Sequence, residues 1–469
     1  MYYQLTKHFN LCRLVLMMLS SVLLPACFNG SNSTGIASLQ NGAINSNSTS
    51  SPTTLANSTL GGQSPVTGAD ITIKAADGSL LATTVSDSNA RYQAKVPDQA
   101  YYPYIISTDT GIDLVTGAPP GFSLITAVTG PDSTIANINP FSTLIVKTAQ
   151  AMPQGLTSST LSLAGQLILQ HLHFGLDTAL VPDPITTPVT PQNLAALAKA
   201  GEILAEMIRR THAALQVVGH DLSENDIVSA MAADMTDGFL DGNGAGGASA
   251  LIAATANIVS GQVLIEGLSN NLNINGAWAT DLLDNAIRAA LPEITTTTAD
   301  VAITAAMLQQ TKTAIGAAQT IDPSETLSTL ALTVNSLKPG MQLSAIEAVL
   351  PEKRGEDFND AITLAVSASN SQWASINAAV RQTSQNPGND KLLALAWYSS
   401  PGEVLGYIVY YGSTPESATT IASETSGTSV EYYTNADLGL NPGDSVCFRL
   451  KAFNLAGLSG FSGAACMYI

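Results

Sequence analysis

The spacing of apolar residues changes twice along this chain, and the two changes divide it into three folded regions. Between residues 64 and 96 apolar side chains recur largely at every second position, as in a β-strand. From about residue 140 they recur at intervals of three and four, as in an α-helix. Alternation returns after residue 388. The 469-residue sequence therefore predicts a multidomain α+β protein, with a β region at 64–136, an all-α region at 137–387 and a second β region at 388–469.

The first 26 residues have the pattern of a secretory signal peptide. Lys7 and Arg13 give a positive start, and the apolar run that ends at Leu24 is too short to span a bilayer comfortably as a permanent helix. The closing motif, Leu24-Pro25-Ala26-Cys27, resembles the lipobox of bacterial lipoproteins. The resemblance implies that Cys27 becomes the first mature residue and carries lipid, such as palmitate, that anchors the chain. The alternative is an ordinary cleaved signal that leaves Cys27 as a free thiol.

The residue after Cys27 bears on which membrane holds the protein. In lipoproteins an aspartate at this position favours retention at the inner membrane, and here Phe28 stands there. The resemblance therefore implies lipid anchoring in the cell outer membrane. Whether the chain faces the cell surface or the periplasm stays open.

Residues 27–63 are dominated by Ser, Asn, Thr and Gly and carry almost no charge. Such a composition cannot bury enough apolar surface to offset the entropy lost on ordering. We expect a flexible tether, and a chain of about 35 residues of this type reaches roughly 30–35 Å.

The charge balance excludes one class of partner. The chain has 18 Lys and Arg against 36 Asp and Glu, for a net charge of −18. Nucleic acids require clustered cations to neutralise their phosphates, so we expect no nucleic-acid partner. Attraction to anionic lipid is disfavoured for the same reason, which leaves the lipid on Cys27 as the expected link to the membrane.

The first β region carries a family resemblance. A strand through Val66, Ile71 and Ile73 is followed by an Asp77-Gly78 turn, a strand from Leu80 to Val85, and a third strand through Tyr92, Ala94 and Val96. This layout resembles the carboxypeptidase-regulatory-like (prealbumin-type) β-sandwich. That family usually has glycine two residues before the aromatic, where this chain has Ala90. The resemblance implies a non-catalytic spacer or adhesive module.

The helical region has recognisable start signals. The sequence from Asn137 to Leu144 resembles a junction of bacterial surface lipoproteins at which a β module meets a helical region, with Pro140 in the first helical turn. Ser223 and Asp226 are spaced as a capping box. We expect a helix opening at Thr190-Pro191 and another opening at Asp322-Pro323-Ser324-Glu325 with Pro323 at its first position. Further helices are expected near 248–266, 278–290, 298–318, 342–350 and 357–383.

The last 82 residues resemble a fibronectin type III domain. The resemblance rests on Trp397 in an early strand, Gly406-Tyr407 in the next, and Leu440 before a turn. It implies a second β-sandwich. The tyrosine that the family usually has at the start of a later strand is replaced here by Val446.

Two cysteines remain once the signal peptide is removed and Cys27 is lipidated. Cys447 and Cys466 lie in β-like runs on either side of a loop that contains the midpoint between them. A hairpin would place them opposite each other, and export to an oxidising compartment predicts a disulfide. The alternative is a pair of reduced, partly buried thiols.

Candidate sites for chemistry are weak in this sequence. Asp237, Asp241 and Gly242 fit positions one, five and six of an EF-hand calcium loop, but Phe239 and Ala248 fail at positions three and twelve. The pattern favours a solvated turn between helices over a calcium site.

Two other groups of side chains are candidates for a metal site or for hydrolysis. His171-Leu172-His173 lacks a third ligand nearby and favours ordinary surface or core histidines. A glycosidase needs two carboxylates facing each other across a cleft. The available helical carboxylates are Glu202, Glu206, Asp281 and Asp284.

These observations favour a non-enzymatic, lipid-anchored envelope protein that displays β modules for adhesion or for contact with a protein or glycan. No catalytic residue, cofactor or metal is expected. One alternative is a periplasmic scaffold or an accessory subunit of an envelope enzyme or secretion complex. Another is a carbohydrate-active enzyme whose catalytic part is the helical region.

Overall fold

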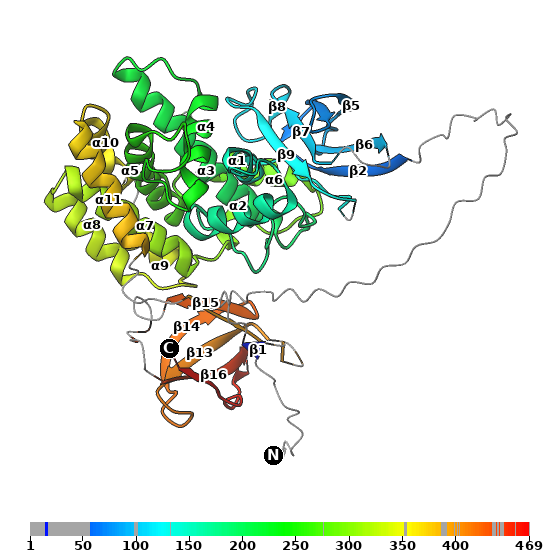
Figure 1. Ribbon diagram of the computed structural model, residues 1–469. Helices are drawn as coiled ribbons and strands as arrows, with labels where there is room; N and C mark the ends of the chain where they lie inside the picture. Colours follow the sequence, from blue (N-terminus) through cyan, green and yellow to red (C-terminus); the bar gives the residue numbers. More distant parts are fainter. Residues whose placement is uncertain are drawn as a thin grey trace, which may run out of the picture.

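The structure is a computed structural model. It describes Val15–Leu16 and residues 57–97, 102–131, 133–274, 276–350, 354–385, 392–397, 399–400, 402, 404–433, 438, 440, 445–454 and 456–468. Within these ranges the chain combines β-strands at both ends with eleven α-helices between them (Figure 1). The predicted mixed α+β class is confirmed, and the C-terminal part is an antiparallel sheet region.

The N-terminal β region is built from two main antiparallel sheets. The first has the strand order β5-β4-β7-β9, and the second pairs β2 with β6. Ile71 and Ile73 of β4 are fully buried while Asp70 and Lys74 are exposed, so the predicted alternation places one face of this strand in the core. The strands of this region are β2 (Asn57–Gln63), β3 (Val66–Thr67), β4 (Asp70–Lys74), β5 (Leu80–Val85), β6 (Arg91–Pro97), β7 (Tyr104–Thr108), β8 (Ile112–Asp113) and β9 (Leu124–Val128).

Strand β2 differs from the sequence prediction. The sequence composition predicts that its seven residues end the tether, but they pair along their whole length with β6. The glycines there serve close packing and not flexibility. A Cβ on Gly62 would lie 2.3 Å from the carbonyl oxygen of Ala136, and one on Gly61 would lie 2.8 Å from that of Tyr92. A glycine-rich composition is typical of linkers, but it also suits a strand to which two other backbone segments come close, here those at Ala136 and Tyr92.

The helices surround α5, which lies in the middle of the α region and packs against α3, α7, α10 and α11. Among the described residues α5 is the one helix long and apolar enough to cross a membrane, but most of it is buried against its neighbours. The helices are α1 (Pro140–Ala151), α2 (Ser158–His171), α3 (Leu194–Val217), α4 (Glu224–Asp234), α5 (Ala250–Leu268), α6 (Ala279–Ala290), α7 (Ala305–Ile321), α8 (Glu325–Ser336), α9 (Leu343–Glu347), α10 (Asn359–Val366) and α11 (Asn370–Gln385).

Short elements complete the α region. They are the 3₁₀ helices Met235–Asp237, Thr298–Asp300 and Arg354–Phe358 and the hairpin of β10 (Asn273–Ile274) with β11 (Ala277–Trp278).

Two of the predicted helix starts are confirmed. Pro140 is the first residue of α1, and the Asn139 side chain accepts a hydrogen bond from the backbone N–H of Ser142. The capping box of Ser223 and Asp226 is formed at α4.

Three details of the predicted helices are wrong. The helix expected from Thr190 begins at Leu194, because the turn at Thr190 is closed by the Asn193 side chain. Pro323 precedes α8, because the Ser324 side chain caps that helix. The run expected at 357–383 is split into α10 and α11, and Trp373 Nε1 donates across the break to the carbonyl of Ala365 at 2.7 Å.

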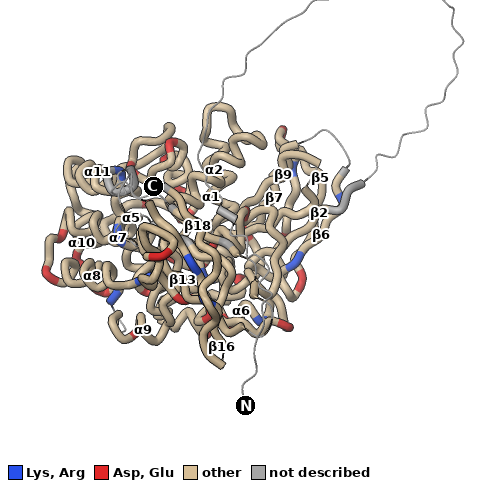
Figure 2. Tube along the Cα trace, turned by 90° about the horizontal axis from the view of Figure 1, so that it is seen from below, with Lys and Arg blue, Asp and Glu red and all other residues tan. Residues whose placement is uncertain are grey.

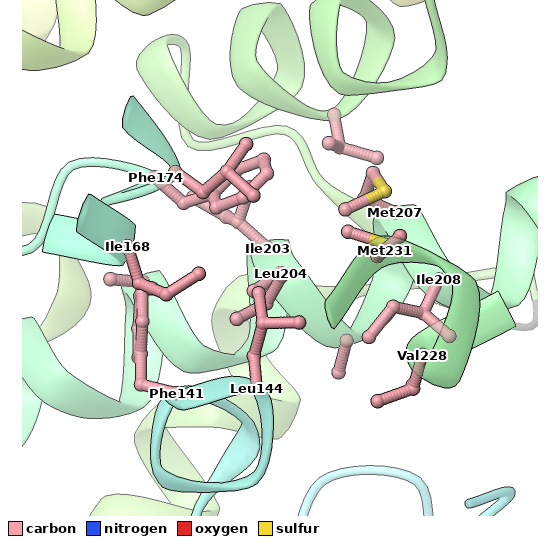
Figure 3. Close-up of a cluster of buried hydrophobic side chains, with 14 of the residues drawn as sticks. Phe141, Leu144, Ile168, Phe174, Ile203, Leu204, Met207, Ile208, Val228 and Met231 are labelled. Atoms are coloured by element: carbon pink, nitrogen blue, oxygen red, sulfur yellow. The ribbon is translucent and has the colours of Figure 1, made fainter. Parts of the chain in front are cut away.

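The N-terminal sheets and the helices share one hydrophobic core. Tyr92 donates from its hydroxyl to the carbonyl of Ala136, and α1 packs against β9. Phe141 and Leu144 of α1 are fully buried and face Ile168, Leu204 and other apolar side chains of α2, α3 and α4 (Figure 3). The boundary expected between residues 136 and 137 therefore does not separate two cores.

The C-terminal strands, joined by the short N-terminal strand β1, form two further sheets with their own cluster of buried apolar residues, which includes Trp397, Tyr407 and Phe448. One sheet has the order β1-β12-β15, and the other has β14-β13-β16-β17 with β18 also pairing β16. The strands are β1 (Val15–Leu16), β12 (Leu392–Ala396), β13 (Gly406–Gly412), β14 (Thr420–Thr425), β15 (Ser429–Tyr433), β16 (Ser445–Asn454), β17 (Gly457–Leu458) and β18 (Ala465–Tyr468). This unit lies beside the helices and contacts α7 through β15 (Figure 1).

Candidate functional site

A cavity of about 260 Å³ lies between the N-terminal sheets and helices α3 and α6. Its walls are mainly apolar. The loop after β8, which contains Pro119 and Pro120, forms one side, and α3 forms the opposite side. The main apolar contributors are Leu114, Val115, Phe122, Leu124, Ile138, Val189, Leu194, Leu197 and Ile287.

The cavity exists because α3 places small residues on the face toward it. Ala198, Gly201 and Ala205 are spaced by three and four, so they lie along one side of the helix. A Cβ on Gly201 would lie 3.7 Å from Cδ of Pro140 and within 4 Å of no other atom outside its own helix and chain neighbours. This stretch of α3 therefore leaves space that larger side chains would fill.

Charged groups also gather in the wall of the cavity, around Arg209. Glu202, Arg209, Glu224 and Asp113 all line it. The guanidinium of Arg209 contacts the carboxylate of Glu202, and its Nε donates to Glu206 Oε2 at 2.7 Å.

The Arg209 cluster continues away from the cavity. Arg210 Nε donates to Glu206 at 2.9 Å, and its two terminal nitrogens donate to Glu266 at 2.8 and 2.7 Å. These bonds link α3 to α5 through partly buried charges.

Burial sets the ionisation of the acids at the cavity. Burial raises the pKa of Glu202 to about 7. The positive charge of Arg209 lowers this pKa, and the negative charges of Asp113 and Glu206 raise it further. Burial also raises the pKa of Glu224, opposed by Arg209 and His212. The Oε2 atom of Glu224 is buried and has no hydrogen-bond partner in the part of the chain that the structure describes.

The four carboxylates considered for a glycosidase are not brought together. Glu202 and Glu206 share the Arg209 guanidinium. Asp284 accepts from the backbone N–H and the hydroxyl of Thr298 at 2.9 and 3.0 Å, and Asp281 lies on the first turn of α6. No pair of them faces across the cavity, which Glu202 alone lines.

The loop considered for calcium is built around an arginine. Arg381 of α11 contacts the carboxylates of both Asp237 and Asp241 and lies 4.8 Å from the ring centre of Phe239. The expectation of a solvated turn is wrong for Asp241, which is almost fully buried. The reason is that Arg381, 140 residues further along, supplies a partner that no local pattern announces.

A second carboxylate holds this loop from within. Asp234 accepts from the backbone N–H groups of Gly242 and Gly244 at 2.7 and 3.0 Å, and burial raises its pKa to about 6.

Of the two neighbouring histidines, His173 is buried and His171 is half-buried. Burial lowers the pKa of both His171 and His173 to about 4, and Nδ1 of His173 accepts from the backbone N–H of Gly175 at 3.0 Å. Among the described residues no group of three or more His, Cys, Asp or Glu side chains is arranged to hold a metal ion.

Cys447 and Cys466 lie opposite each other on β16 and β18 and form a disulfide with an S–S distance of 2.01 Å. Cys27 and the lipobox lie outside the described residues.

The charged residues that are described are sparse, and Lys and Arg are dispersed in the view of Figure 2.

Comparisons with known proteins give no relative from which a site could be transferred. No protein-family model matches this chain, and no curated protein has a similar sequence.

Sequence reasoning missed Asp113, Arg209, Glu224 and Arg381 as members of charged clusters. One signal was present: Glu202, Glu206 and Arg209 are spaced by four and three and therefore lie on one face of a helix. The contributions of Asp113 and Glu224 come from other elements and have no such signal.

Proposed function

We propose that this chain is a lipid-anchored envelope protein of the outer membrane that acts by binding. It presents its β regions for adhesion or for contact with an envelope or extracellular protein or glycan. The observation that carries the proposal is the Leu24-Pro25-Ala26-Cys27 motif at the end of a short apolar run. The disulfide between Cys447 and Cys466 supports an oxidising compartment.

We further propose that residues 388–469 form a fibronectin type III domain. Two features support this. The strands divide into one sheet that contains β12 and β15 and another ordered β14-β13-β16, with β18 also pairing β16. Trp397 is buried, and its ring centre lies 5.4 Å from that of Tyr407 in an edge-to-face arrangement.

The proposal for residues 64–136 is a carboxypeptidase-regulatory-like sandwich. The sheet β5-β4-β7-β9 and the pair β2-β6 support it. Ala90, which replaces the glycine of that family, has a left-handed backbone with φ of 57°. The backbone at this position therefore has a conformation that favours glycine, although the residue is alanine.

The anchor is tested by Cys27→Ser. We expect the wild-type protein to stay with membranes after a high-salt wash and the variant to be released, because the lipid supplies the binding free energy. A variant that stays with the membranes would contradict the anchor.

The exposure of the protein is tested by protease treatment of intact cells, with detection of residues 388–469. Loss of the signal supports contact outside the cell. Protection until the outer membrane is broken favours the second candidate, a periplasmic scaffold or accessory subunit.

A further inference from the structure

We propose that the cavity between the N-terminal sheets and helices α3 and α6 binds one small, neutral, apolar molecule of about ten carbon atoms, such as a single ring with a short alkyl chain. The ligand is held by burial of its surface, without a charged or hydrogen-bonding head. This site goes beyond the anchor and the surface contacts proposed above and does not depend on them.

The amide side chains of the lining are already paired within the protein. Asn137 donates from Nδ2 to the carbonyl of Thr187 at 2.7 Å, and its Oδ1 accepts from the backbone N–H of Gln63 at 3.2 Å. Asn139 Oδ1 accepts from the backbone N–H of Ser142 at 2.8 Å. These side chains hold the walls together and are not available to a ligand.

The charged side chains of the lining are engaged in the same way. Asp113 Oδ1 accepts from the backbone N–H groups of Val115 and Thr116 at 2.8 and 2.9 Å. The carboxylate of Glu202 contacts the guanidinium of Arg209. The local charges are therefore met by protein groups and give a charged ligand no free partner.

Glu224 does not change this conclusion. Its Oε2 atom has no partner among the described residues, but Gly121 covers it: a Cβ on that glycine would lie 2.2 Å from Oε2. A polar ligand would therefore give up its hydrogen bonds to water and gain none in the cavity, whereas an apolar ligand has none to lose.

The walls offer apolar surface from separate elements. Phe122 and Leu124 at β9, Leu197 on α3 and Ile287 on α6 line the cavity, and all four side chains are buried. Burial of apolar surface against such walls is favourable in proportion to the area removed from water. The walls therefore select for hydrocarbon.

The volume sets the size of the ligand. A dry apolar cavity of about 150 Å³ is enough to bind benzene. This cavity has about 260 Å³, which in proportion accommodates about ten carbon atoms. It lies below the range of roughly 300–1,000 Å³ usual for drug-sized ligands, so a large cofactor does not fit.

The apolar lining reaches the protein surface. Leu114, Val189 and Ala198 belong to it and are half-buried, and Ala118 and Pro119 beside them are exposed. A ligand can therefore enter at the loop after β8, and its binding covers apolar side chains that otherwise meet water.

The test uses n-butylbenzene, toluene and phenol as probes, with the mature chain carrying Cys27→Ser. The protein is titrated into a dilute solution of each probe in a calorimeter. We expect n-butylbenzene to bind about tenfold more tightly than toluene, because it buries more apolar surface. Phenol, which has the shape of toluene, should bind about tenfold more weakly than toluene, because its hydroxyl finds no partner.

Variants locate the bound probe. Ala198→Phe fills the cavity from α3 and is expected to weaken n-butylbenzene at least tenfold. The matched control is Ala213→Phe, at an exposed position of the same helix, which should leave binding unchanged. If Ala198→Phe does not fold, Gly201→Val serves the same purpose, because a Cβ there meets only Cδ of Pro140, at 3.7 Å.

Three results would overturn the proposal. Failure of n-butylbenzene to bind up to its solubility limit would exclude an apolar ligand site. Equal affinities for toluene and phenol would show that a polar group of the wall is free to meet a ligand. Unchanged binding of n-butylbenzene in a folded, filled variant would place the probe elsewhere on the protein.

Discussion

Glu202 illustrates how a position on one helix sets the ionisation of a side chain. Its pKa is raised from 4.5 to about 7, so between these values the folded protein holds a proton that the unfolded chain lacks. The stability that this proton contributes is present below pH 4.5 and is lost as the pH rises through about 7.

Glu202→Gln removes that dependence. Relative to wild type, the free energy of unfolding of the variant should rise between pH 4.5 and pH 7, by an amount on the order of 1–3 kcal/mol. Urea denaturation at pH 4.5 and pH 7 measures the difference. The control is Glu347→Gln, at an exposed position on α9, whose free energy of unfolding should change with pH as that of wild type does. An equal difference in the free energy of unfolding between variant and wild type at both pH values would contradict a buried Glu202 carboxyl that holds a proton.

Arg381 is the residue on which the loop between α4 and α5 depends. Arg381→Gln leaves the buried carboxylate of Asp241 without its cation. Because Arg381 is itself about one-third exposed, we expect a loss of roughly 1–3 kcal/mol in the free energy of unfolding. Arg288→Gln, on the exposed side of α6, should change it by less than about 0.5 kcal/mol. Equal effects of the two changes would contradict the structural role of Arg381.

At the scale of elements, the same substitution should have opposite effects on two helices. In α5, a Cβ on Gly261 would lie 2.3 Å from Cε1 of the fully buried Phe358. In α7, a Cβ on Gly316 would meet nothing within 4 Å.

Gly261→Ala is therefore expected to lower the free energy of unfolding by about 2–3 kcal/mol through overpacking. Gly316→Ala should raise it by about 0.5–1 kcal/mol, because alanine has the higher helix propensity. Chemical denaturation of the pair measures both effects. A loss at Gly316 as large as that at Gly261 would contradict the packing around α5.

Local signals were sufficient for several elements. The capping box at Ser223 and the proline at the start of α1 act within one turn of chain, so the sequence predicts them. The predictions failed where a side chain closes the backbone in a way that spacing does not show. Asn193 closes the turn before α3, and Trp373 bridges the break between α10 and α11.

Among the described residues of the whole molecule, buried apolar side chains form three clusters, and the two largest are separate. One spans the N-terminal sheets and the helices, and the other lies within the C-terminal sheets. In the second, the disulfide joins two cysteines that are 19 positions apart in the sequence.

Replacing both Cys447 and Cys466 with alanine should lower the stability of the C-terminal sheets by about 3 kcal/mol. Hydrogen exchange followed peptide by peptide in denaturant measures it. Peptides from α5, in the other cluster, are the internal control. If α5 lost protection together with β16, the two parts would unfold as one unit.

Long-range arrangement was the part that the sequence did not predict. The shared core across residues 136 and 137 depends on Ala136 meeting Gly62 and Tyr92. The cavity needs α3, α6 and the loop after β8 together, and Arg381 reaches Asp241 from 140 residues away. Such contacts are set by how elements pack, and no spacing within one segment reports them.

The lipid proposed on Cys27 can be detected in a single measurement. Mass spectrometry of the N-terminal peptide, from protein extracted from the membranes of cells that produce it, reads both the cleavage site and the modification. We expect a peptide that begins at Cys27 and carries acyl chains, and that is absent from Cys27→Ser. A peptide that begins elsewhere, or one that contains an unmodified Cys27, would contradict it.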